Sequence, residues 1–377
     1  METTQPRGFL THRIVSSIQR RLLGRDRATR PAAEISPDDE RAPLESLRGA
    51  AVVAVHNPTY QGITHSTRRL FAHTYPFPAP PAFHPTQFQD GQVAHHADLL
   101  LSTGVLHFVI SGGDLIHHRL VALLKERAPG VRIDLLWHGS YIQFGEDYDW
   151  KMFQLWMKAA REGKIHKLGV VKKGMEEFLE GQGIRSAFVA NFVPGVPLPP
   201  PSIAGSDLQV GIWISRMNHR KLPFAMLAAL KMIPGARLHA TGLGPRAREV
   251  IETFGIPTEC LPDRPLSPDE LTAAMRRTHL SLYVTFSECT PMLPLESLHA
   301  GVPCLVGPVS HLFEDHPYLF DRLVVRFPDR AEVIARQMIR VAEERDAIVA
   351  AYTGYAASYN EEAKRLLETF LEGARDG

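Results

Sequence analysis

The stretch SECTPMLPLESLHAGVPCLV (287–306) follows an apolar run, LSLYVTF (280–286), and the two together decide the fold class. The apolar run predicts a buried parallel strand. Thr290 is expected to cap a helix, with Pro291 at the first helical position and the helix over 292–300. A glycine then ends the helix, and VPCLV predicts the next strand. This order of strand, loop, helix and strand is typical of an α/β protein with a parallel sheet.

Two glutamates in this stretch are candidates for ligand binding. Glu288 is expected at the carboxyl end of the strand, and Glu296 about two turns into the helix. Ligands of open α/β sheets bind outside the carboxyl ends of the strands. An ionised carboxylate accepts several hydrogen bonds, so each glutamate could hold a pair of sugar hydroxyls, while the free amides of the first helical turn favour a diphosphate. The alternative is two solvated surface glutamates, and the spacing alone does not separate these interpretations.

The stretch resembles the C-terminal motif of retaining, nucleotide-sugar-dependent glycosyltransferases of the GT-B fold. That motif is a Glu, seven residues, a second Glu, and an Ala-Gly-x-Pro turn into a strand. Here the motif corresponds to Glu288, Glu296 and 300–303. The resemblance is strongest over about 208–310 and collinear over about 50–193. It implies two Rossmann-like, doubly wound parallel-sheet domains facing a central cleft, with Glu288 at the donor sugar and Glu296 at the ribose.

The residues just after the first glutamate depart from the family pattern, which often has a Gly and an aromatic there. This chain has Cys289, Thr290 and Pro291. Because proline has no amide hydrogen, Met292 and Leu293 must supply the N–H groups that face a phosphate. Thr290, Met292 and Leu293 are therefore the expected donor-binding residues of this turn.

The composition is that of an ordinary soluble globular protein. The 377 residues are 44% apolar and 22% charged, with a formal net charge of +1, so no global basic field argues for nucleic acid. Three cysteines without CxxC spacing argue against a disulfide framework or a zinc site, and suit a reducing compartment. No apolar stretch predicts a membrane span or a secretory signal. The expected location is the cytoplasm or the inner face of its membrane.

Residues 1–48 predict a basic extension and linker. Between Arg7 and Arg30 the only acidic residue is Asp26. Four apolar residues recur at four-residue spacing with arginines off that stripe: Leu10, Ile14, Ile18 and Leu22, beside Arg13, Arg20 and Arg21. This pattern in residues 7–30 predicts a basic amphipathic helix on an anionic membrane surface. The alternatives are a frayed extension, a helix packed on the body of the protein, and a transit peptide.

Alternating strands and helices predict two domains. The first spans 49–193, and a proline-rich hinge over 194–206 leads to the second domain, 207–354. A helix in the tail, 355–377, is expected to cross back to the first domain, as the resemblance implies. Near the end of the second domain we expect a short strand over 322–327 and one long helix from Ala331 to Ala351.

The resemblance extends to two positions in the first domain. Gly62 follows the predicted strand AAVVAV (50–55), where the family has a Gly-rich turn that approaches the donor diphosphate. His138 ends the strand predicted over 131–140 and is followed by a glycine. The family often has such a histidine close to the reacting carbon of the donor, whereas the alternative is a structural histidine with satisfied hydrogen bonds.

The resemblance also assigns basic and glycine residues in the second domain. Arg216 and Lys221 follow the strand predicted over 208–215, and two cations in one turn can clamp a diphosphate. Arg220 is a rival for the second role. Gly242 lies in a turn after the next predicted strand, where the family has a glycine beside the nucleotide.

The resemblance implies a metal-independent hexosyltransferase that moves a sugar from a nucleotide-diphosphate donor to a glycan or lipid-linked acceptor, in surface polysaccharide or glycoconjugate synthesis. No cofactor is expected. No Asp-x-Asp lies where a metal-bound diphosphate would need it, because Asp147-Tyr148-Asp149 falls in a predicted helix. One alternative is a non-catalytic sugar- or nucleotide-binding relative that acts in a complex. Another, an epimerase of the same architecture, would need further acid and base residues.

Overall fold

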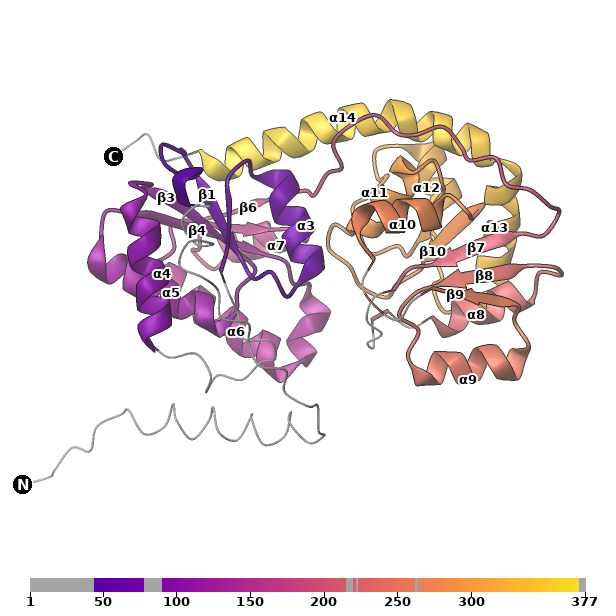
Figure 1. Cartoon of the computed structure of the whole chain (residues 1–377), viewed down its shortest axis with the longest axis horizontal. Helices are drawn as coiled ribbons and strands as arrows, with labels where there is room; N and C mark the ends of the chain where they lie inside the picture. Colours follow the sequence, from indigo (N-terminus) through magenta and orange to yellow (C-terminus); the bar gives the residue numbers. More distant parts are fainter. Residues whose placement is uncertain are drawn as a thin grey trace, which may run out of the picture.

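The computed structural model describes residues 44–77, 90–214, 220–221, 223–261, 264 and 266–372. Figure 1 shows two domains side by side, joined by an extended segment and by the long helix α14 (Arg345–Leu371). The amphipathic stretch 7–30 and Arg216 lie outside the described residues. None of the described helices combines the length and the apolar character that crossing a membrane would need.

The first domain is built on a six-stranded parallel sheet in the order β2-β1-β3-β4-β5-β6. Its strands are β1 (Val53–His56), β2 (Thr74–Pro76), β3 (His107–Ser111), β4 (Arg132–Trp137), β5 (Leu168–Val170) and β6 (Ser186–Phe188). The helices are α3 (Gln61–Leu70), α4 (Asp90–Ser102), α5 (Leu115–Arg127), α6 (Asp147–Arg161) and α7 (Met175–Glu180), with a 3-10 turn η1 (Tyr141–Gly145). The central strands β1, β3 and β4 are almost wholly buried, which explains their continuous apolar runs.

The second domain is built on a five-stranded parallel sheet in the order β11-β10-β7-β8-β9. Its strands are β7 (Gln209–Ile212), β8 (Arg237–Ala240), β9 (Thr258–Cys260), β10 (Leu280–Tyr283) and β11 (Cys304–Val306). The helices are α8 (Phe224–Lys231), α9 (Pro245–Phe254), α10 (Pro268–Met275), α11 (Met292–His299), α12 (Pro317–Leu323) and α13 (Ala331–Glu343). Two doubly wound parallel sheets confirm the predicted fold class.

Each sheet has its own hydrophobic core. The first core includes Leu44 and Leu47, so packing of the first domain begins before the strand β1. A third, smaller cluster joins the domains, and it contains Cys289 of the second domain together with Ala363 and Phe370 of α14. Close packing across the interface therefore contributes to the relative placement of the two domains.

Helix α14 ties the second domain to the first (Figure 1). Its beginning buries Tyr352 in the second core, whereas Phe370 near its end packs under the first sheet. A Cβ added to Gly169 of β5 would lie 2.9 Å from the Phe370 ring, so this strand needs glycine where the helix crosses it. A helix of 27 residues is about 40 Å long, enough to reach across both domains.

Two predicted elements in this region were wrong. The segment 322–327 is not a strand: α12 (Pro317–Leu323) covers its start, and only Val324 pairs with β11, as an isolated bridge to Val306. The helix expected over 331–351 breaks at Glu344 into α13 and α14, and α14 absorbs the separate tail helix. The buried apolar residues keep a helical spacing of about 3.6 residues from α13 into α14, so the sequence pattern does not reveal the break at Glu344.

The structure explains why the Ala-Gly-x-Pro turn has glycine at position 301. Gly301 has a φ of 78°, in the left-handed region. Its missing side chain also makes room for the hinge, because an added Cβ would collide with the carbonyl oxygens of Leu198 and Pro199. The turn therefore ends α11 and lets the hinge pass against it.

Candidate functional site

The segment 287–290, between β10 and α11, is held at the interface of the two domains. The Ser287 hydroxyl donates to Ser140 Oγ at 3.0 Å. The Thr290 hydroxyl donates to the carbonyl oxygen of Val171 at 3.0 Å, and Asn191 Nδ2 donates to the Thr290 carbonyl at 2.8 Å. The predicted N-cap was therefore wrong: Pro291 occupies the cap position of α11, and the Thr290 side chain binds the first domain instead.

Glu288 is buried among basic and phenolic groups at the carboxyl end of β10. Its side chain is 10% exposed, and the Tyr283 hydroxyl donates to its Oε1 at 2.8 Å. Lys221 Nζ lies 3.3 Å from Oε1, and Arg220 Nη1 lies 3.8 Å from Oε2. Burial and the neighbouring Glu288 charge raise the pKa of Tyr283 well above its usual range. The structure thus brings Glu288 and Lys221 together, with Arg220 as a further cation.

Glu296 lies on the second turn of α11 and faces the first domain. Arg69 Nη1, from the last turn of α3, lies 2.9 Å from Glu296 Oε1. The two side chains are 22% and 17% exposed. His65 lies one turn earlier on α3, where burial lowers its pKa and the Glu296 charge partly opposes that shift. Sequence reasoning missed Arg69, because nothing within α3 indicates a partner so distant in the chain.

His138 lies at the carboxyl end of β4, as expected. Its Nε2 is 2.9 Å from Ser111 Oγ, which is 2.6 Å from Thr67 Oγ1. Burial lowers the pKa of His138 to about 4, so the imidazole is neutral at neutral pH. The thiol of Cys289 donates to the His138 carbonyl at 3.5 Å, and burial raises the pKa of that thiol to about 12. The histidine therefore offers hydrogen bonds and no positive charge.

The remaining predicted residues lie on strand-to-helix turns and helix starts. Gly62 is the second residue of α3, and an added Cβ there would meet only open space. Gly242 has a φ of 63°, so the turn between β8 and α9 favours glycine for its backbone conformation. Met292 and Leu293 begin α11, where a helix leaves its first N–H groups without helical partners. Both side chains also pack against the second core.

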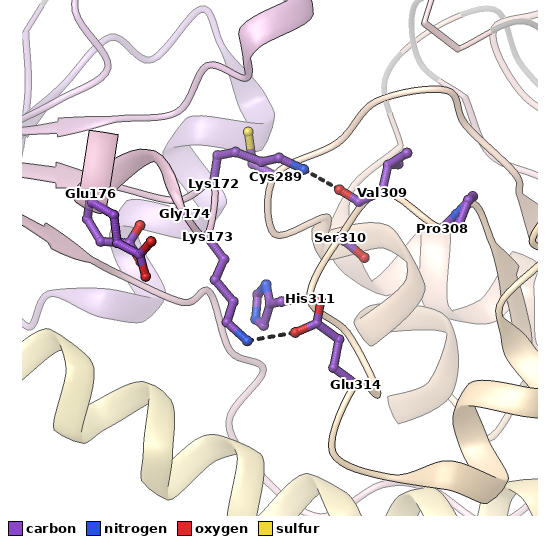
Figure 2. A pocket seen from close by; sticks show the side chains of 11 residues that line it. Lys172, Lys173, Gly174, Glu176, Cys289, Pro308, Val309, Ser310, His311 and Glu314 are labelled. Atoms are coloured by element: carbon purple, nitrogen blue, oxygen red, sulfur yellow. Dashed lines mark hydrogen bonds and ion pairs between the residues drawn. The ribbon is translucent and has the colours of Figure 1, made fainter. Parts of the chain in front are cut away.

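A cavity of about 320 Å³ is lined by residues of both domains, among them Cys289 of segment 287–290 (Figure 2). Lys172 lines this cavity, and its Nζ donates to the carbonyl oxygen of Glu288 at 3.1 Å and to that of Val309. Lys173 Nζ forms an ion pair with Glu314 Oε2 at 2.6 Å. Two consecutive lysines of the first domain thus bind two loops of the second, and sequence reasoning assigned neither.

Within the described ranges, no three His, Cys, Asp or Glu side chains lie together in a way that could hold a metal ion. The polar groups near the domain interface include carboxylates, lysines, arginines and a neutral imidazole.

Comparisons with known proteins find structures of the same fold, but their sequences are only distantly similar to this chain. No protein-family model matches the chain, and no curated protein matches it. Among solved structures, the apo structure of OtsA is 14% identical with a TM-score of 0.59, covering 87% of this chain and 100% of that one. Alr3699/HepE of Anabaena, in complex with UDP-glucose, is 12% identical with a TM-score of 0.58, covering 85% and 98%. A glycosyltransferase from Rickettsia africae is 13% identical with a TM-score of 0.59, covering 86% and 99%.

Proposed function

From these matches the chain has the GT-B fold, and we propose that it is a retaining glycosyltransferase that uses a nucleotide-diphosphate sugar. The observation that carries the proposal is the placement of Glu288 and Glu296 on either side of the start of α11, each with basic partners at the domain interface. Carboxylates that accept hydroxyl hydrogens, beside cations that attract a diphosphate, suit both halves of such a donor.

The basic side chains have a role in leaving-group departure. Lys221 and Arg220 both contact Glu288, which lies four residues before Met292 at the start of α11. When the sugar–phosphate bond breaks, negative charge grows on the diphosphate, and prearranged cations and helix-terminal amides stabilise that charge. Arg216, beyond the described residues, is proposed to join them. Glu288 is proposed to hold hydroxyls of the donor sugar.

The first domain is proposed to carry the acceptor side of the reaction. Neutral His138 can exchange hydrogen bonds with a sugar hydroxyl without opposing the positive charge that develops on the sugar ring. The departing phosphate oxygen is proposed to take the acceptor proton, as the resemblance to retaining GT-B glycosyltransferases implies. The acceptor is proposed to be a glycan or lipid-linked sugar, handled without a bound metal, at the cytoplasmic side of a membrane.

A donor-hydrolysis assay tests the proposal. Since the Anabaena structure holds UDP-glucose, that sugar nucleotide is the first to incubate with the purified protein, followed by other nucleotide hexoses. We expect slow release of nucleoside diphosphate that Glu288→Gln abolishes while affinity for the free diphosphate persists. Glu249→Gln, on the exposed surface of α9, is the matched control. Tight nucleotide binding with no turnover of any donor would instead support a non-catalytic binding protein.

A further inference from the structure

Arg69 reaches Glu296 from the opposite domain, and its position is well defined. Helix α3 is held to the domain interface by a hydrogen bond from Ser66 to Asn191 and by the contact of Thr67 with Ser111. Leu70, next in the helix, packs in the cluster that joins the two domains. The packing of α3 therefore fixes the backbone of Arg69 at the domain interface, opposite Glu296.

The contact between Arg69 and Glu296 leaves hydrogen-bonding capacity on both sides. Although Arg69 Nη1 lies 2.9 Å from Glu296 Oε1, this buried nitrogen makes no well-directed hydrogen bond to any described group. A carboxylate accepts about four hydrogen bonds, and Arg69 is the one partner of Glu296 found in the described part of the chain. A buried donor that makes no hydrogen bond is destabilising, so a ligand that accepts a hydrogen bond from it gains affinity.

A vicinal diol fits this arrangement of one free acceptor and one free donor. Each hydroxyl can donate its hydrogen to the carboxylate, and an oxygen lone pair of the same hydroxyl can accept from the guanidinium. A phosphate would satisfy Arg69 but would be repelled by Glu296. The pair as a unit is therefore better suited to neutral hydroxyls than to an anion.

We propose that Arg69 is a donor-binding residue supplied by the first domain, and that it holds the ribose diol of the nucleotide together with Glu296. This inference rests on the proposed function, in which Glu296 holds the ribose. It adds that the ribose site is shared between the domains. Nucleotide affinity then depends on both domains being in contact, before any acceptor is bound.

The test is calorimetric binding of UDP and of 2′,3′-dideoxy-UDP to the full chain. Removing one hydrogen bond between charged and uncharged groups costs about tenfold or more in affinity. We expect Arg69→Met to lose about tenfold in UDP affinity and Arg69→Lys to recover part of it, whereas both variants bind the dideoxy nucleotide as the wild type does. Arg68→Met is the matched control, because Arg68 is the exposed neighbour on the same helix.

The binding results for the Arg69 variants decide whether Arg69 holds the ribose. Unchanged UDP affinity in Arg69→Met overturns the assignment. Tighter binding also overturns it, and would make Arg69 a competitor of the ribose. Equal losses for UDP and its dideoxy form would show that Arg69 acts on another part of the nucleotide or only on the fold. If Arg69→Met does not fold, Arg69→Lys must still show a loss confined to the ribose form. Failure of the wild type to bind any nucleoside diphosphate would reject the proposed function itself.

Discussion

Tyr283→Phe is the substitution whose effect can be worked out most directly from the structure. The change removes one hydroxyl, which donates to Glu288 Oε1 at 2.8 Å, and leaves the ring in place under Lys221 Nζ, 5.3 Å from its centroid. Tyr283 is 5% exposed and the Glu288 side chain 10%, so water cannot replace the lost donor at low cost. Packing changes little, because phenylalanine has the same ring.

The expected loss follows from the type of hydrogen bond. A hydrogen bond to a charged group contributes about 1.5–3 kcal/mol, and each kcal/mol lowers the melting temperature of a domain of this size by about 2–4 °C. The melting temperature of the Tyr283→Phe protein should therefore fall by about 3–12 °C. Donor turnover should also fall, because Glu288 loses the contact that orients it between Lys221 and Arg220.

Tyr318→Phe provides the matched control for this measurement. The Tyr318 hydroxyl donates to Glu344 Oε2 at 2.9 Å, the same chemistry on a half-buried surface where Arg322 also binds the carboxylate. We expect a loss below about 1 kcal/mol there, because solvent and Arg322 remain as partners. Differential scanning calorimetry measures the loss of stability in both variants relative to the wild type. Equal losses, or no loss in Tyr283→Phe, would refute the reasoning that a buried, charge-accepting hydrogen bond stabilises Glu288.

Further predictions address the donor site, the pH response and the N-terminal segment. Glu296→Ala should weaken nucleoside diphosphate binding by about 1.5–3 kcal/mol in calorimetry, and unchanged affinity would contradict its role at the ribose. Lys221→Ala should lower kcat more than it raises KM in a steady-state donor assay, since leaving-group charge peaks in the transition state, and EDTA should leave wild-type turnover intact. Because burial lowers the pKa of His138 from 6.5 to about 4, the unfolded chain binds the extra proton, so stability should be full above pH 6.5 and fall toward pH 4. His138→Gln should flatten that fall in pH-dependent denaturant melts, and an unchanged profile would argue against the buried neutral imidazole. Full-length protein should bind anionic vesicles at low salt through residues 7–30, whereas a chain starting at Leu44 should not, and equal flotation of both would reject membrane contact.

Several elements follow from local sequence, and the structure bears this out. The bounds of helix α5 (Leu115–Arg127) follow from its local apolar spacing and from the turn residues that flank it. The capping box of Ser267 and Glu270 opens α10, and both of its reciprocal hydrogen bonds form within four residues of the chain. Buried strands also follow from apolar runs, although their ends move by a few residues. These features depend on neighbours in the chain, so the sequence alone determined them.

The site depended on the sequence for its carboxylates and on the tertiary structure for their partners. The motif spacing identified Glu288 and Glu296, because one helix sets the distance between them. Nothing local predicted that Arg69 would pair with Glu296 or that Lys172 would bind the carbonyl of Glu288. Nor did local capping rules predict that the Thr290 hydroxyl would turn to Val171. These contacts form between residues far apart in the chain, and only the packing of the two domains and α14 brings them within hydrogen-bonding distance.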